Sequence, residues 1–362
     1  MRYLDTKILF IGLFAGMVLT NSCSQKQVTK TREVWPKEKA NEWGKQHGWL
    51  RGCNFIPSTA VNQLEMWQAE TFDTATINRE LGWAEWLGMN TMRVFLHHAA
   101  WQIDTAGFKN RIGQYLAIAN KHGIGTIFVF FDDCWGGAYH TGKQPDPKPG
   151  YHNTAWVGDP GDAIFSDSAL LPILEKYVKD IMISFASDKR VIMWDLYNEV
   201  GDNSKGEKSW PLLKKIYNWG HEVNPSQPIT AGLWYYAVPA MNKYLAENAD
   251  IITYHNYQND TLQRKFIDSM SIFGRPLICT EYMARTLGSR FDNIMPLLKE
   301  KNVGAINWGL VAGKTNTIYG WDEPIPDGSE PKLWFHDIFR KDGTPYKKEE
   351  ADLIRSLTGK IK

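Results

Sequence analysis

The chain has 362 residues, of which 41 are basic and 40 acidic, so its formal net charge is +1 at pH 7. Nucleic-acid binding needs a basic face, and this balance therefore argues against a nucleic-acid partner. The length, with 13% aromatic residues, is sufficient for one large domain with a substantial core.

The N-terminus has the pattern of an export signal. Two basic residues precede the apolar run 8–19, which is too short to span a membrane comfortably. Ser22 before Cys23 resembles a bacterial lipoprotein processing site. We therefore expect residues 1–22 to be a lipoprotein signal peptide, Cys23 to be the lipidated N-terminus, and residues 23–40 to be a polar tether. The protein would then be exported and membrane-tethered, in the periplasm or at the cell surface; ordinary signal cleavage nearby is the alternative.

Residues 41–362 are expected to form one catalytic domain, in which short apolar runs alternate with segments of helical length. Removal of residues 1–22 would leave a mature chain, residues 23–362, without net charge. The predicted strands are 50–55, 90–96, 125–131, 190–198, 228–234, 250–257, 275–282 and 303–310. Predicted helices such as 75–88, 111–123, 168–186 and 209–223 lie between them. Eight such units predict an α/β fold, a single-domain (β/α)8 TIM barrel. A doubly wound open sheet is the alternative, but no glycine-rich phosphate loop follows the first strand.

Polar and aromatic residues gather where these strands end. In a barrel of this kind the active site lies at the C-terminal ends of the strands, so these residues are candidates for function. They are Arg93, His98, Asp132, Asp133, Trp135, Asn198, Glu199, Trp234, His255, Tyr257, Glu281 and Trp308.

Glu199 and Glu281 end the fourth and seventh strands, which face each other across the mouth of an eight-stranded barrel. Hydrolysis of a glycosidic bond with retention needs two carboxyl groups about 5–5.5 Å apart. Surface salt bridges are the alternative for a single glutamate, but two at matched strand ends favour catalysis.

The motifs at these positions resemble clan A glycoside hydrolases, the 4/7 superfamily, and family 5 (cellulase- and mannanase-like) in particular. They are "WDLYNEV" (194–200), "LICTEYMA" (277–284), "TYHNY" (253–257), "TMRVF" (91–95) and "AINWGL" (305–310). Together they extend over about residues 48–340. The resemblance implies a retaining O-glycosyl hydrolase that needs no cofactor or metal.

The resemblance also implies individual roles. Glu199 would be the general acid/base and Glu281 the nucleophile. Asn198 would bind the sugar 2-hydroxyl. Arg93 and Tyr257 would keep the nucleophile ionised.

Two further roles follow from the same motifs. His255 would lie near the acid/base, and Trp308 would form a platform under the sugar. A core imidazole and plain core packing are the respective alternatives.

The third strand departs from family 5, which usually has a histidine at its end. This chain has Asp132 and Asp133 there, and carboxylates accept hydrogen bonds from sugar hydroxyls. We expect a contact between one of them and the sugar; a capped turn is the alternative.

The long loop after the third strand, about residues 132–165, has little periodicity, and long loops in compact domains are often functional. We expect it to form a wall over the site that closes one end of the cleft and favours exo-type action on a β-linked glycan. Its aromatic and imidazole side chains are Trp135, Tyr139, His140, Tyr151, His152 and Trp156.

Several alternatives stay open at this point. One is an endo-acting β-glucanase, mannanase or xylanase of the same clan, and another is a non-catalytic glycan-binding lipoprotein. A metal-dependent amidohydrolase is a third. Its ligands would be drawn from His97, His98, Asp132, Asp133 and His255, although the first strand lacks the His-x-His that this chemistry expects.

Cys53, Cys134 and Cys279 are widely spaced without a CxxC motif, so neither a disulfide framework nor a zinc site is indicated.

Overall fold

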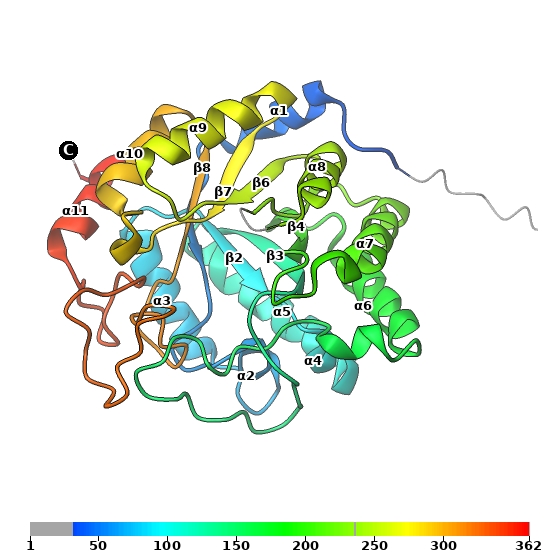
Figure 1. Cartoon of the computed structure of the whole chain (residues 1–362), viewed down its shortest axis with the longest axis horizontal. Coiled ribbons are helices and arrows are strands. Elements are labelled where there is room, and N and C mark those ends of the chain that lie inside the picture. Colours follow the sequence, from blue (N-terminus) through cyan, green and yellow to red (C-terminus); the bar gives the residue numbers. More distant parts are fainter. Residues whose placement is uncertain (1–31, 235–236, 362) are drawn as a thin grey trace, which may run out of the picture. The chain divides into compact units, whose positions relative to one another are not determined.

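Eight parallel strands form one sheet at the centre of the protein (Figure 1). The computed structural model describes residues 32–234 and 237–361. The strands are β1 Arg51–Asn54, β2 Thr91–Phe95, β3 Gly125–Asp132, β4 Val191–Asn198, β5 Ile229–Thr230, β6 Ile252–His255, β7 Leu277–Glu281 and β8 Gly304–Trp308. They pair in the order β5-β4-β3-β2-β1-β8-β7-β6, and every pair is parallel.

The sheet closes between its two edge strands. Leu233, just beyond β5, forms a parallel bridge with Tyr254 of β6, and backbone N–H groups of Leu233 and His255 donate across this seam. Closure excludes the open-sheet alternative and confirms the predicted (β/α)8 barrel.

Helices surround the strands in Figure 1, as a barrel requires. They are α1 Lys37–His47, α2 Gln63–Trp67, α3 Thr74–Trp86, α4 His98–Ile103, α5 Thr105–Lys121, α6 Leu170–Phe185, α7 Trp210–Val223, α8 Pro239–Asn248, α9 Asp260–Met270, α10 Phe291–Glu300 and α11 Lys348–Leu357. The described residues also form four short 3₁₀ turns: η1 Asp162–Phe165, η2 Gly206–Ser209, η3 Ser271–Phe273 and η4 Arg285–Leu287.

The strand β5 is shorter than the predicted 228–234. Only Ile229 and Thr230 pair with β4, after which the chain turns toward β6. A Cβ on Gly232 would lie 3.3 Å from Nε2 of His255. Because β5 ends early and Gly232 has no side chain, there is room beside them for the imidazole of His255.

The described part of the predicted tether packs against the domain. Arg32 forms a buried ion pair with Asp250, whose Oδ1 accepts from the backbone N–H of Trp35 at 2.7 Å. Trp35 is buried, and α1 begins at Lys37. The predicted tether boundary at residue 40 is therefore wrong, because these contacts include residues 32–40 in the domain.

The predicted signal peptide, the lipidation site Cys23 and the tether up to residue 31 lie outside the described residues. Of the helices that the structure describes, none has the length and apolar character needed to cross a bilayer.

The barrel interior changes from apolar to polar toward the C-terminal ends of the strands. Ile127, Met193 and Ile306 belong to a buried cluster that also includes Trp35. Nearer the strand ends the interior holds polar side chains such as Arg93 and Asp195, both fully buried. Buried polar groups must be hydrogen-bonded, and this layer supports the site described next.

Candidate active site

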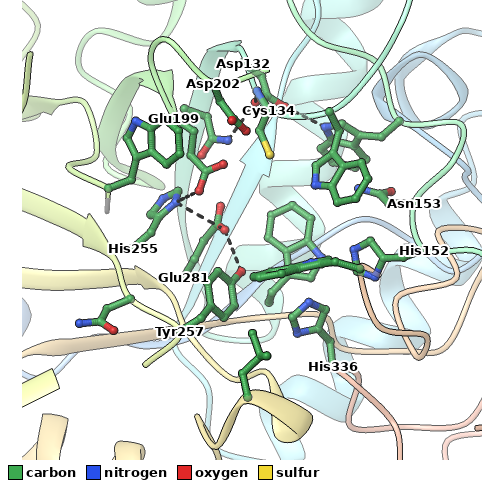
Figure 2. A pocket seen from close by; sticks show the side chains of 18 of the residues that line it. Asp132, Cys134, His152, Asn153, Glu199, Asp202, His255, Tyr257, Glu281 and His336 are labelled. Atoms are coloured by element: carbon green, nitrogen blue, oxygen red, sulfur yellow. Dashed lines mark hydrogen bonds and ion pairs between the residues drawn. The ribbon is translucent and has the colours of Figure 1, made fainter. Parts of the chain in front are cut away.

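Glu199 and Glu281 line one cavity of about 340 Å³ at the C-terminal ends of the strands (Figure 2). Glu281 is the last residue of β7, and Glu199 directly follows β4. His255 lies between them, with its Nδ1 2.7 Å from Oε1 of Glu199 and 3.5 Å from Oε2 of Glu281. One atom of each residue lies within 4.8 Å of the other two. The two carboxyl groups are therefore about as close as a retaining mechanism requires, and closer than the roughly 6.5–9.5 Å of an inverting one.

Beneath the cavity, the buried Arg93 connects the strands that carry the two glutamates. Its Nη1 donates to Oε1 of Glu281 at 3.0 Å and to Oδ1 of Asn54 at 2.8 Å. Its Nε donates to Oδ2 of Asp195 at 2.8 Å, and its Nη2 donates to Oδ1 of Asn198 at 2.7 Å. These contacts satisfy a buried cation and fix Glu281 relative to Asn198.

The other oxygen of Glu281 accepts a hydrogen bond from the hydroxyl of Tyr257 at 2.8 Å (Figure 2). Burial raises the pKa of Tyr257 well above its ordinary value, with a further contribution from the charge of Glu281. The phenol therefore stays protonated and acts as a donor. Its ring meets Trp321 edge to face, with centroids 5.0 Å apart.

Burial raises the pKa of both Glu199 and Glu281 from 4.5 to about 7. Two coupled carboxyl groups this close share a proton, and their other contacts decide where it resides. Glu281 has a cation and a phenol donor. Glu199 faces His255, which is neutral because burial lowers its pKa to about 4. We therefore place the proton on Glu199 and the negative charge on Glu281.

This assignment predicts a bell-shaped dependence of kcat/KM on pH, with the alkaline limb falling above about pH 7 as Glu199 loses its proton. This alkaline limb should be observed with an aryl glycoside whose phenol is a poor leaving group. It should be nearly absent with a 2,4-dinitrophenyl leaving group, which departs without a proton donor. An alkaline limb of equal size with both leaving groups would contradict the assignment.

The raised pKa of Glu199 also has a consequence for stability. The unfolded chain releases this proton near 4.5, whereas the folded chain holds it to about 7, so the stability of the fold falls between these pH values. We expect Glu199→Gln to raise Tm at pH 8 by about 3 °C or more, and to leave Tm nearly unchanged at pH 4.5. A Tm difference that does not depend on pH would show that the carboxyl group is not destabilised by burial.

Two loops form the walls of the cavity. The β3 wall, residues 133–161, contributes Cys134, Trp135, His152, Asn153 and Trp156. The β8 wall, residues 309–347, contributes Trp321, Asp322 and His336. The position of the β3 wall agrees with the prediction from the sequence.

The two walls are joined to each other. The backbone N–H of Asn153 donates to the carbonyl of Thr315 at 2.8 Å, and Nδ1 of His152 donates to the carbonyl of Tyr319 at 2.8 Å. Gly150 has φ +75°, and a Cβ there would lie 1.6 Å from the carbonyl oxygen of Ile325. Only glycine fits at this contact, which brings the backbones of the two walls together.

The structure brings most of the predicted site residues together. Those that line the cavity are Asp132, Trp135, Asn198, Glu199, Trp234, His255, Tyr257, Glu281 and Trp308. Trp234 donates its Nε1–H to the carbonyl of Val200, next to Glu199. Arg93 lies beneath the cavity, so it can reach the sugar only through its partners.

His98 is wrongly predicted as a sugar-binding residue. It is buried, with its Nδ1 against Asp159 and its Nε2 2.9 Å from the hydroxyl of Tyr139. The chain turns into α4 at His98, which directs the imidazole into the protein beside the β3 wall.

Asp133 is also wrongly predicted to contact the sugar. Its carboxylate is buried and accepts from the backbone N–H of Gly201 at 2.8 Å, from the hydroxyl of Tyr197 at 3.0 Å and from Ser209. Asp133 thus holds the turn that follows Glu199, whose backbone has the unusual φ of 43°. The capped-turn alternative describes it correctly.

The proposed amidohydrolase ligands do not form one cluster. Within the described residues, His97 and His98 approach Asp159, whereas His255 approaches the two glutamates. The metal-dependent alternative therefore loses its ligand set on geometric grounds.

Several residues of the site were not predicted from the sequence. Asn54 and Asp195 are buried polar residues within apolar strands, a signal that was visible in the sequence. Trp321 and Asp322 lie in an irregular loop far along the chain, and no pattern there indicated that they would reach the cavity.

Similar solved structures share the barrel fold. An endo-β-1,4-mannanase from Thermotoga petrophila is 16% identical, with a TM-score of 0.55, over 88% of this chain and 77% of its own. An exo-β-1,4-mannosidase, Op5Man5, from Opitutaceae bacterium strain TAV5 is 18% identical, with a TM-score of 0.59, over 86% of this chain and 60% of its own. A GH5_18 protein from Bifidobacterium longum, in complex with Manβ1-4GlcNAc, is 12% identical, with a TM-score of 0.55, over 86% of this chain and 78% of its own. At these identities the likeness establishes the fold.

No protein-family model matches the sequence, and no curated protein matches it.

Proposed function

We propose that the protein is a retaining glycoside hydrolase that cleaves a β-linked glycan or oligosaccharide. One observation carries this proposal: the carboxyl groups of the partly exposed Glu199 and the buried Glu281 have oxygen atoms within 4.8 Å of each other in a cavity lined with tryptophan. Their surroundings differ as an acid and a nucleophile require, because of the two glutamates it is Glu281 that accepts hydrogen bonds from Arg93 and Tyr257.

The reaction proceeds in two steps. In the first, a carboxylate oxygen of Glu281 attacks the anomeric carbon while Glu199 gives its proton to the departing glycosidic oxygen. In the second, Glu199 takes a proton from water, which attacks the same carbon and releases Glu281. Each step inverts the anomeric centre, so the overall reaction retains its configuration.

Two neighbouring residues are suited to binding the sugar at the cleavage point. Asn198 lines the cavity next to Glu199, and it would contact the 2-hydroxyl. Trp308 presents an indole to the same cavity, with Trp156 meeting it edge to face at 5.7 Å. An aromatic face packs well against the C–H groups of a pyranose ring.

The experiment that tests the function is hydrolysis of a panel of 4-nitrophenyl β-glycosides. Mannosides should come first, because two of the similar barrels are named as a mannanase and a mannosidase. Turnover of at least one glycoside by the wild type supports the proposal. Binding of oligosaccharides without any turnover would instead favour the glycan-binding alternative.

We also propose exo-type action, in which the β3 and β8 walls, bonded to each other beside the cavity, would close one side of it. Chain-end release predicts that the viscosity of a long polysaccharide falls slowly while reducing sugar accumulates. A rapid fall in viscosity at low release would show endo-type cleavage.

Lipid attachment at Cys23 is a separate proposal, carried by the sequence alone. Expression in a bacterium with an alkyne-labelled palmitate should label the wild type. The Cys23→Ala variant should remain unlabelled, and a labelled variant would overturn the proposal.

A further inference from the structure

Asp132, at the end of β3, lies at the wall of the cavity but is only 1% exposed. Its Oδ1 accepts from Nδ2 of Asn198 at 2.9 Å and from the backbone N–H of Cys134 at 2.9 Å. Its Oδ2 accepts from Nε1 of Trp156 at 2.8 Å. Three protein donors thus already converge on a carboxylate that the sequence predicted would bind sugar hydroxyls.

The amide of Asn198 is held from both ends. Its Oδ1 accepts from Arg93 at 2.7 Å, and its Nδ2 donates to Asp132. An amide reversed in this site would direct its NH₂ group at a guanidinium and its oxygen at a carboxylate, so the two contacts exclude the reversed orientation. One N–H of Asn198 is left to point elsewhere, and the side chain lines the cavity.

Asp132 also ties the β3 wall to the catalytic strand β4. Trp156 belongs to that wall and packs between Phe95, at 5.2 Å, and Trp308, at 5.7 Å. The indole N–H of Trp156 donates to the carboxylate of Asp132, which also accepts from the amide of Asn198.

We propose that Asp132 is a positioning residue that orients the amide of Asn198 toward the 2-hydroxyl of the sugar at the cleavage point. This inference rests on the proposed function, in which Asn198 binds that hydroxyl. Asp132 then affects the rate through Asn198, and its effect depends on whether the substrate has a 2-hydroxyl.

Three substitutions separate the hydrogen bond of Asp132 to Asn198 from its hydrogen bond to Trp156. Asp132→Ala removes the acceptor of Asn198 and that of Trp156. Asp132→Asn retains one oxygen, which should face the two donors Asn198 and Cys134, so only the contact with Trp156 is lost. Trp156→Phe removes the same contact from the other side and is the matched control.

The test compares 4-nitrophenyl β-D-mannopyranoside and β-D-glucopyranoside with their common 2-deoxy derivative, 4-nitrophenyl 2-deoxy-β-D-arabino-hexopyranoside. The measured quantity is the ratio of kcat/KM with and without the 2-hydroxyl. We expect Asp132→Ala to lower this ratio by about 100-fold, because contacts to the 2-hydroxyl strengthen in the transition state. Asp132→Asn and Trp156→Phe should keep the ratio within about threefold of the wild type.

An Asp132→Ala variant that loses equal activity on both kinds of substrate would overturn the proposal, since a merely structural role slows every substrate alike. If this variant does not fold, Asp132→Ser takes its place, because a serine hydroxyl is too short to reach both partners.

Failure of the proposed function would be recognised separately, as a wild type that hydrolyses no glycoside of the panel. The crystal structure of the Asp132→Ala variant would then decide. A rotated Asn198 amide supports the positioning role, and an unchanged amide overturns it.

Discussion

Replacement of Glu281 by alanine is expected to lower kcat by at least about 10⁴-fold, because the covalent route through the glycosyl–enzyme has no substitute nucleophile. Glu281 lies 3.0 Å from Nη1 of Arg93 and 2.8 Å from the hydroxyl of Tyr257, so it is the carboxyl group best held in the ionised state. Steady-state kinetics with the best aryl glycoside of the panel measures the loss.

Two further measurements make the role of Glu281 specific. Azide should restore turnover of Glu281→Ala and yield the glycosyl azide of inverted configuration, since azide enters the space of the lost carboxylate. A 2-deoxy-2-fluoro glycoside should label the wild type on the peptide that contains Glu281. A label on Glu199 or Asp322 would refute the assignment, as would unchanged turnover of the alanine variant.

Replacement of Glu199 by alanine should have an effect that depends on the leaving group. For substrates that need a proton donor, we expect a loss of about 10²–10⁴-fold in kcat/KM, the usual range for general acid catalysis. For a 2,4-dinitrophenyl glycoside, kcat/KM should change little, while kcat falls because water is no longer activated in the second step.

Azide again provides the control for Glu199. It should accelerate Glu199→Ala by replacing the water, and the product should be a glycosyl azide of retained configuration. The opposite anomers expected from the two alanine variants distinguish the acid/base from the nucleophile. Equal losses for all leaving groups would instead indicate that Glu199 has only a structural role.

The sequence predicted the barrel and the two glutamates for the same physical reason. Parallel strands bring their C-terminal ends to one rim, so Glu199 after β4 and Glu281 at the end of β7 meet once eight strands close. Order along the chain was sufficient for this inference. The order of the strands does not determine, however, in which direction each side chain at the rim points.

His98 and Asp133 show this limit. Asp133 directly follows the last residue of β3, and His98 lies three positions after the end of β2. So close to a strand end, a difference of one position decides whether a side chain enters the cavity or the protein. His98 begins α4 and turns toward Asp159, whereas Asp132 and Asp133 direct their carboxylates to different partners. Trp321 belongs to the β8 wall, which is bonded to the β3 wall by contacts between residues more than 150 positions apart.

The most direct test of this account is the configuration of the first product, followed by ¹H NMR during hydrolysis of an aryl β-glycoside by the wild type. Two carboxyl groups with oxygens within 4.8 Å of each other predict that the β-anomer of the free sugar forms first and then mutarotates. Initial formation of the α-anomer would contradict the double displacement, and with it the roles of Glu199 and Glu281.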